Sequence, residues 1–268
     1  MLRSSVSILF LFVLSVSIFA HEYWLEPATF FLKLNERSVV HLYVGEALKQ
    51  DEEREFQSSK TPLFKLFSTH DTFDLLGTIR EEEKPLFSFS SEREGTFLLA
   101  LERNWSYITL EPKQFEDYLR EDGIEYIIAE REKLGEVKKE GKERYSRYLK
   151  SLLQVGGKRD KAFARLVGST LEIVPLENPY SKKAGDSLEF QVLFLGKPLT
   201  GKTIFADNRD GERVVKQQMK TDSQGKITVK IDRKGIWLVR LVYMRRCAKN
   251  CEGADWESFW SALSFGIR

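Results

Sequence analysis

The sequence has 268 residues, in which 42 lysine and arginine residues nearly balance 40 aspartate and glutamate residues. This near balance gives no indication of the strongly basic charge that is typical of proteins binding nucleic acid or a membrane surface. Aromatic residues make up 12% of the chain and include 19 phenylalanines, which is typical of β-rich cores rather than of a coiled or disordered chain.

The first 20 residues have the pattern of a secretory signal peptide. Arg3 supplies the positive end, an apolar run extends from Val6 to Val16, and the small Ala20 marks the expected cleavage site. The alternative is an uncleaved membrane anchor, but this run is shorter than the roughly 20 residues that a spanning helix needs. We therefore predict removal of residues 1–20 and a periplasmic protein that is not embedded in the membrane after cleavage.

Residues 21–111 are predicted to form an N-terminal β-sandwich domain. β-Branched and aromatic residues indicate a strand at 39–44, and His41 lies within it. The charged tract 49–55 is expected to be a solvated loop. Further runs of strand length lie at 63–67, 87–89, 96–101 and 107–110.

Residues 112–157 change to a helical period and are predicted to form a helical insertion. Pro112 suits a first helical turn, and the first helix is expected to end at Gly123. A second helix is predicted over 124–134 and a third over 138–155. The apolar face of the third helix would carry Tyr145, Tyr148, Leu149 and Leu152.

Strand patterns return in residues 158–268, which are predicted to form a C-terminal immunoglobulin-like β-sandwich domain. Short strands separated by turns are expected at 188–194, 203–206, 227–231, 235–243 and 259–267. The predicted fold is therefore mainly β, with two β-sandwich, immunoglobulin-like domains and a helical insertion between them.

The chain has two cysteines, Cys247 and Cys251, separated by three residues. Outside the cytoplasm a disulfide between them is the favoured interpretation. The alternative is a thiolate metal site, but two thiolates without a histidine nearby in the sequence are a weak metal signature.

His21 follows the expected cleavage site directly and would become the first residue of the mature chain. Its α-amino nitrogen and its ring Nδ1 could then bind one metal ion in a six-membered chelate. His70, in a predicted loop, or His41 would supply a further imidazole. Imidazole suits nickel, cobalt and copper alike, so the residues do not select among these metals. The alternative is that His21 only begins a strand.

The sequence does not predict an enzyme with a recognisable catalytic set. It contains no Gly-x-Ser-x-Gly motif, and its three histidines leave little room for a catalytic triad. Its Gly-Lys-Pro and Gly-Gly turns do not form a phosphate-binding loop. We therefore assign no catalytic and no organic-cofactor residues.

Eight segments of the chain form a pattern by their order and spacing: 21–27, 115–123, 143–150, 154–156, 171–175, 178–179, 196–198 and 255–265. Together they resemble one family, the domain of unknown function 4198. The resemblance covers essentially the whole mature chain and implies a secreted component associated with nickel and cobalt uptake, with a membrane metal-uptake system as its partner. The sequence departs at Phe259, where the family often has tyrosine.

Together these features predict a periplasmic transition-metal-binding protein that assists nickel, cobalt or copper uptake through its N-terminal histidine chelate. Two alternatives remain open. A secreted structural or interaction module would need no metal, and a copper-dependent oxidase or mono-oxygenase of the histidine-brace type would use the same terminal chelate with an open coordination position.

Overall fold

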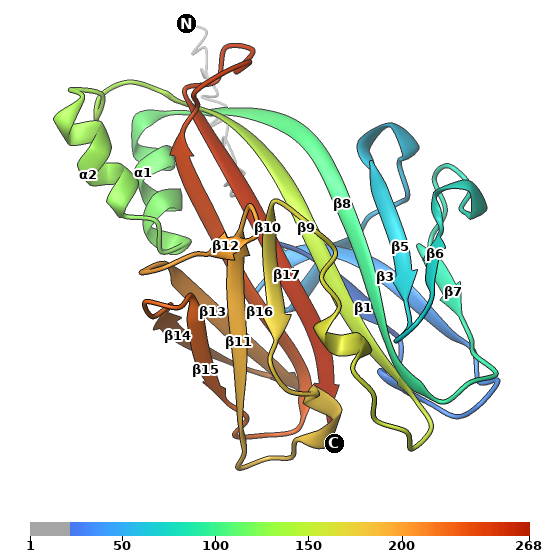
Figure 1. The fold of residues 1–268 in the computed structure, drawn as a ribbon. Coiled ribbons are helices and arrows are strands. Elements are labelled where there is room, and N and C mark those ends of the chain that lie inside the picture. The colour runs from blue at the N-terminus through green and yellow to red at the C-terminus, as the bar shows by residue number, and fades with distance from the viewer. Residues whose placement is uncertain (1–21) are drawn as a thin grey trace, which may run out of the picture.

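The computed structural model describes residues 22–268, and it is mainly β, as predicted (Figure 1). The predicted signal peptide, residues 1–20, and His21 lie outside the described residues. Three sheets account for the strands: one of nine strands and two of four strands.

The nine-stranded sheet forms the centre of the molecule. Its strand pairs are antiparallel except for β17–β9 and β2–β9, which are parallel. The short β2 (Phe31–Leu32) pairs with β9 beside the main order. That order is β14 (Arg213–Lys220), β13 (Thr203–Asp210), β16 (Gly235–Arg246), β17 (Trp256–Ile267), β9 (Gly141–Val155), β8 (Gly95–Leu110), β5 (Leu63–Phe67) and β6 (Thr72–Asp74).

The two four-stranded sheets come from opposite halves of the sequence. The first, here called the N-terminal sheet, contains β1 (Glu22–Pro27), β3 (Ser38–Glu46), β4 (Lys49–Glu53) and β7 (Phe87–Phe89). The second, here called the C-terminal sheet, contains β10 (Leu171–Pro175), β11 (Ser187–Phe194), β12 (Lys197–Pro198) and β15 (Lys226–Lys230).

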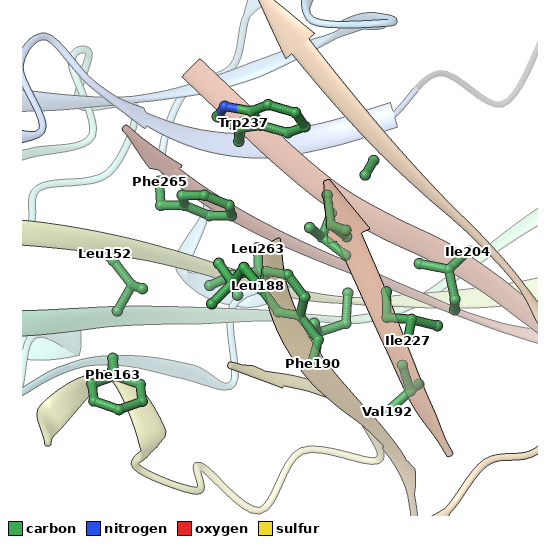
Figure 2. Close-up of a cluster of buried hydrophobic side chains, with 14 of the residues drawn as sticks. Leu152, Phe163, Leu188, Phe190, Val192, Ile204, Ile227, Trp237, Leu263 and Phe265 are labelled. Carbon is green, nitrogen blue, oxygen red and sulfur yellow. The ribbon is translucent and has the colours of Figure 1, made fainter. Parts of the chain in front are cut away.

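Each smaller sheet packs on a different face of the central sheet. Along β9, Leu149 and Leu153 join the core beneath the N-terminal sheet, whereas Leu152 joins the core beneath the C-terminal sheet. This alternation follows from the two-residue period of a strand. Figure 2 shows the core beneath the C-terminal sheet. There the ring of Phe190 on β11 packs beside that of Phe265 on β17, with 5.9 Å between the ring centroids.

Two α-helices follow β8 and lie beside one end of the long strands (Figure 1). They are α1 (Pro112–Glu121) and α2 (Tyr126–Lys133). Pro112 stands at the start of α1, and Glu111 and Gln114 form a capping box there. Four short 3₁₀ helices occupy Ser58–Lys60, Leu76–Thr78, Ala162–Ala164 and Pro179–Ser181.

The third helix predicted over 138–155 is wrong, because β9 occupies Gly141–Val155. This strand is covered on both faces and buried at nearly every position, so its apolar residues do not alternate regularly with polar ones. Such a run also contains the spacing of a helix face. The helical part of the predicted insertion 112–157 therefore ends with α2.

The charged tract predicted to be a loop is also partly wrong, because β4 occupies Lys49–Glu53. This strand lies at the edge of the N-terminal sheet and is largely exposed, which explains its polar composition. The runs 96–101 and 107–110 are confirmed as strand, but they belong to one continuous strand, β8, with an irregularity between Arg103 and Ser106.

The central sheet contains strands from both segments that the sequence assigns to separate sandwiches. Strands β5, β6 and β8 precede residue 112, and β13, β14, β16 and β17 follow residue 157. Among residues 22–268, no helix is both long enough and apolar enough to cross a membrane.

Candidate functional site

His41 lies on β3 and is held by a carboxylate. Its Nδ1 is 2.7 Å from Oε1 of Glu53, and its side chain is 21% exposed. The ring stacks on Tyr43 with centroids 5.2 Å apart. A histidine oriented by a carboxylate in this way keeps Nε2 as the nitrogen that can accept a proton or bind a metal.

His70 lies far from His41 in the fold, in the exposed turn between β5 and β6. Its main-chain N–H donates to the Ser68 hydroxyl at 3.3 Å. The two histidines line different clefts, of about 560 Å³ for His41 and 760 Å³ for His70. The structure therefore does not bring these two predicted ligands together.

Among the described residues, no group of three or more histidine, cysteine, aspartate or glutamate side chains could hold a metal ion. The third predicted ligand, His21, lies outside these residues, but its neighbour Glu22 begins β1. Glu22 pairs with Gly45 and Glu26 pairs with His41. Four residues of strand, about 14 Å, therefore separate the start of β1 from the level of His41.

Glu22 is buried in a cluster of charged side chains centred on Arg240 of β16. The guanidinium of Arg240 lies 2.5 Å from Glu22, 2.7 Å from Asp207 and 3.7 Å from Asp122. Glu22 also accepts a hydrogen bond from the main-chain N–H of Ala47 at 3.2 Å. We call Glu22, Asp122, Asp207 and Arg240 the buried charge cluster.

The buried charge cluster contains three carboxyl groups and one guanidinium. Burial raises the pKa of Glu22 to about 8 and that of Asp122 to about 7, although Arg240 opposes both increases. The Oδ1 atom of Asp207 is buried without a hydrogen-bond partner in the described part of the chain. With all three acids ionised, this interior would hold more negative than positive charge, which costs free energy.

Two exposed carboxylates, Glu46 and Glu121, border the cluster; we call them the acidic rim. Glu46 follows Gly45, the residue paired with Glu22, and Glu121 precedes Asp122 at the end of α1. Burial is the largest cause that raises the pKa of Glu121, and repulsion from Glu46 adds to it. Carboxylate oxygens near the start of β1 could complement nitrogen donors on a metal ion.

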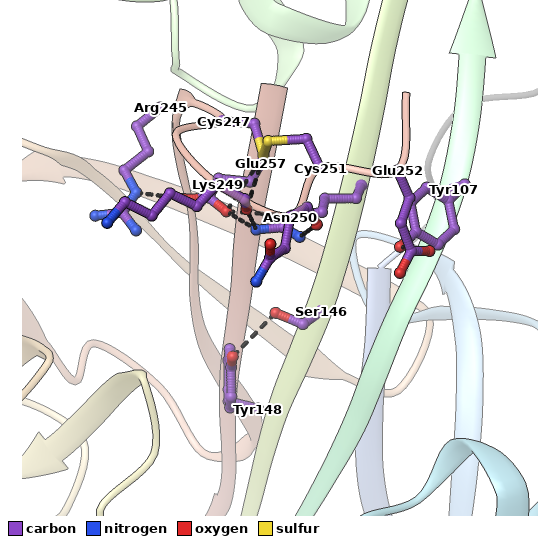
Figure 3. A network of polar contacts seen from close by, with 11 residues as sticks. Tyr107, Ser146, Tyr148, Arg245, Cys247, Lys249, Asn250, Cys251, Glu252 and Glu257 are labelled. Atoms are coloured by element: carbon purple, nitrogen blue, oxygen red, sulfur yellow. Dashed lines mark hydrogen bonds and ion pairs between the residues drawn. A yellow bond between two sulfur atoms is a disulfide. The ribbon is translucent and has the colours of Figure 1, made fainter. Parts of the chain in front are cut away.

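Cys247 and Cys251 form a disulfide in the loop between β16 and β17 (Figure 3). Arg144 of β9 donates to the main-chain oxygens of Lys249 and Asn250, the former at 3.2 Å. The guanidinium of Arg144 also lies 2.5 Å from the carboxylate of Glu257. The buried Arg144 therefore links the disulfide loop to the central sheet.

Sequence reasoning missed the buried charge cluster. One signal was present: Arg240 interrupts the apolar run Trp237-Leu-Val-Arg-Leu-Val242. A charge within a buried strand requires partners. The sequence did not indicate that these partners would be Glu22, Asp122 and Asp207, because they come from three distant segments.

Residues 18–245 match the family described as Domain of unknown function (DUF4198), and the chain belongs to this family. The resemblance read from the sequence is thereby confirmed. No curated protein matches the chain.

Three solved structures illustrate how weak the structural likenesses are. Trypsin-activated alpha-2-macroglobulin from Escherichia coli is 8% identical with a TM-score of 0.23, and the match covers 92% of this chain but 15% of that one. The adhesin InvE of Yersinia pseudotuberculosis is 12% identical, with a TM-score of 0.22 and coverages of 92% and 58%. For the bacteriophage RB49 outer capsid protein Hoc the identity is 8%, the TM-score 0.19 and the coverages 91% and 59%. The chain thus spans less than two thirds of each of these chains.

Proposed function

We propose that this protein binds a transition-metal ion, nickel, cobalt or copper, in the periplasm through the N-terminal amine and imidazole of His21. It would deliver the ion to a membrane metal-uptake system. The observation that carries the proposal is the acidic rim, Glu46 and Glu121, beside the strand start that follows His21. Amine, imidazole and carboxylate together form a donor set that suits these metals.

In this proposal the carboxylates of the acidic rim, instead of His70, are the additional ligands of the metal ion that His21 binds. His70 lies in the β5–β6 turn. His41, on β3, lies opposite Glu26, which is about 14 Å along β1 from Glu22. Glu46 and Glu121 are exposed, so they can exchange water for a metal without breaking a buried interaction. The amine must lose its proton to bind, which is a mild competition at neutral pH because its reference pKa is about 7.7–8.0.

The chelate is tested by titrating nickel, cobalt and copper into protein that starts at His21 and into protein with one extra glycine before it. The extension converts the α-amine into an amide, so affinity is expected to fall about tenfold or more. Glu46→Gln and Glu121→Gln should each weaken binding, whereas His70→Gln should not. Equal affinity with and without the extension would contradict the proposal.

The same samples separate the alternative functions. Reductant-dependent oxygen consumption by the copper-loaded protein would indicate a histidine-brace oxidase instead of a carrier. The absence of binding for all three metals would leave a structural or interaction module.

We also propose that the two sandwiches have immunoglobulin-like topology. Short antiparallel strands joined by turns, such as β11–β12 and β13–β14, support this proposal. The division into domains 21–111 and 158–268 stays a prediction, and the cooperativity of unfolding tests it.

A further inference from the structure

Four arginines are buried among residues 22–268: Arg131, Arg144, Arg147 and Arg240. Arg144 and Arg240 form ion pairs with carboxylates. Arg131 donates to two main-chain oxygens, at 2.7 Å and 2.5 Å. Arg147 differs, because no carboxylate of the described chain lies within ion-pairing distance of it and its Nε is buried without a hydrogen-bond partner.

The neighbours of Arg147 are aromatic rings. Its guanidinium carbon lies 4.1 Å from the ring centroid of Tyr23, 4.6 Å from that of Tyr145 and 5.6 Å from that of Trp260. Rings stabilise the cation through their faces. They do not accept the in-plane N–H bonds of a guanidinium, which has five such donors. Arg147 is 7% exposed, so these donors lack most of the water that would otherwise satisfy them.

A second arginine lies directly across from Arg147. Arg103 of β8 is its partner in the β8–β9 register, and like charges in directly opposed positions destabilise a sheet. Burial lowers the pKa of Arg103, and the charges of Arg147 and Arg54 lower it further. The hydrogen bond from Arg103 goes to the neutral amide oxygen of Gln57 at 2.6 Å. The ring of Tyr23 lies beside both guanidiniums, with its centroid 5.8 Å from the guanidinium carbon of Arg103 and 4.1 Å from that of Arg147. Neither arginine forms an ion pair with a carboxylate of the described residues.

The carboxyl group of Glu143 does not fill this role. Its Oε1 accepts hydrogen bonds from Tyr118 at 3.1 Å and from Ser258 instead of from Arg147. Burial raises its pKa to about 7, so at neutral pH it is only partly ionised. Glu143 therefore does not supply a full compensating charge to Arg147 and Arg103.

The space around Arg147 limits what can bind. A cavity of about 20 Å³ lies beside it and is bordered also by Tyr23, Trp260 and two members of the buried charge cluster, Glu22 and Arg240. This is room for one water-sized group. A larger ion would have to approach from the Arg103 side, where Tyr23 and Arg103 are partly exposed.

We propose that Arg147 and Arg103, together with the hydroxyl of Tyr23, bind a small anion bearing carboxylate or phosphate oxygens. Guanidinium groups bind such oxygens in pairs of parallel hydrogen bonds. The anion would neutralise the opposed arginines and provide acceptors for the free N–H groups. This site does not depend on His21 and stands whether or not a metal binds there.

The test is calorimetric titration of the mature protein with sodium acetate and with sodium phosphate, at an ionic strength held constant with sodium chloride. We expect millimolar or tighter binding of at least one anion. Binding of acetate alone would assign a carboxylate ligand, and binding of phosphate alone would assign a phosphate ligand.

Arg147→Met keeps a long apolar side chain among the three rings and removes the donors. It should weaken anion binding about tenfold or more, as the loss of charge-assisted hydrogen bonds predicts. Arg103→Met should have a similar effect. Arg93→Met is the matched control, because Arg93 is exposed and pairs with Asp71 at 3.3 Å on a different hairpin.

Thermal unfolding provides a second measurement that does not require tight binding. Without added anion, Arg147→Met should be at least as stable as the native protein, because it removes an uncompensated buried charge. Acetate or phosphate should raise the melting temperature of the native protein but not that of the variant. No binding of either anion to the native protein, or equal binding to Arg147→Met, would overturn the proposal and leave Arg147 hydrated by water.

Discussion

Glu143 is the residue for which the structure gives the clearest dependence of stability on pH. It is 2% exposed, and burial outweighs its hydrogen bonds from Ser258 and Tyr118 to raise its pKa from 4.5 to about 7. The folded state therefore keeps a proton that the unfolded chain loses. The contribution of Glu143 to stability is complete below about pH 4.5 and is lost as the pH rises towards 7.

Glu143→Gln should remove this dependence, because the amide has the shape of the protonated acid. Between about pH 5 and about pH 8, urea unfolding should show the native protein losing on the order of 3 kcal/mol relative to the variant. Glu177→Gln, at a position where the side chain is 51% exposed, is the control and should follow the native protein. Parallel pH profiles for the native protein and Glu143→Gln would contradict this assignment.

Single residues also show where sequence reasoning succeeds. The prediction that His41 lies within a strand is confirmed, because β3 occupies Ser38–Glu46. The partners of Arg240 and the lack of a partner for Arg147 could not be predicted, since both depend on which strands become neighbours. Charge in an apolar run reveals that a compensating group is needed but not where it lies.

At the level of elements, the contact between α1 and β9 depends on a glycine. A Cβ atom at Gly141, where β9 begins, would lie 2.1 Å from the ring of Phe115 on α1. The ring is fully buried, so it has little space to move. The first residue of β9 thus sets how closely the helix packs on the sheet.

Gly141→Ala should therefore destabilise the protein by about 1–3 kcal/mol, the usual cost of overpacking a core. Gly157→Ala is a matched control, since a Cβ atom there would meet nothing within 4 Å. The measurement is the midpoint of urea unfolding for both variants. A shift for Gly141→Ala no larger than that for Gly157→Ala would contradict the prediction, because it would show that α1 moves to accommodate the added methyl group at little cost.

Elements were predicted well where one face is polar and poorly where both faces are buried. The alternation in Ser187–Phe194 leads directly to β11, which has exposed residues between its buried ones at the start of the strand. In β9, both neighbouring layers bury the strand, and its sequence therefore also satisfies a helical pattern. The spacing of apolar residues alone cannot distinguish a strand that is covered on both faces from a helix.

At the scale of the whole molecule, the N-terminal and C-terminal sheets both pack on the nine-stranded sheet, so we predict that they unfold together. Calorimetric unfolding of the protein from His21 onward should show one transition, with equal calorimetric and van't Hoff enthalpies. Two separable transitions would instead favour independent domains over 21–111 and 158–268.

The position of β17 has a consequence for the order of folding. This strand lies between β16 and β9 and is the last strand of the described chain to be synthesised. Until Trp256–Ile267 leaves the ribosome, β16 and β9 each have an open edge where β17 would pair. The central sheet therefore cannot be completed before Trp256–Ile267 is available to pair with both of its neighbours, although β16 and β9 are already present in the chain.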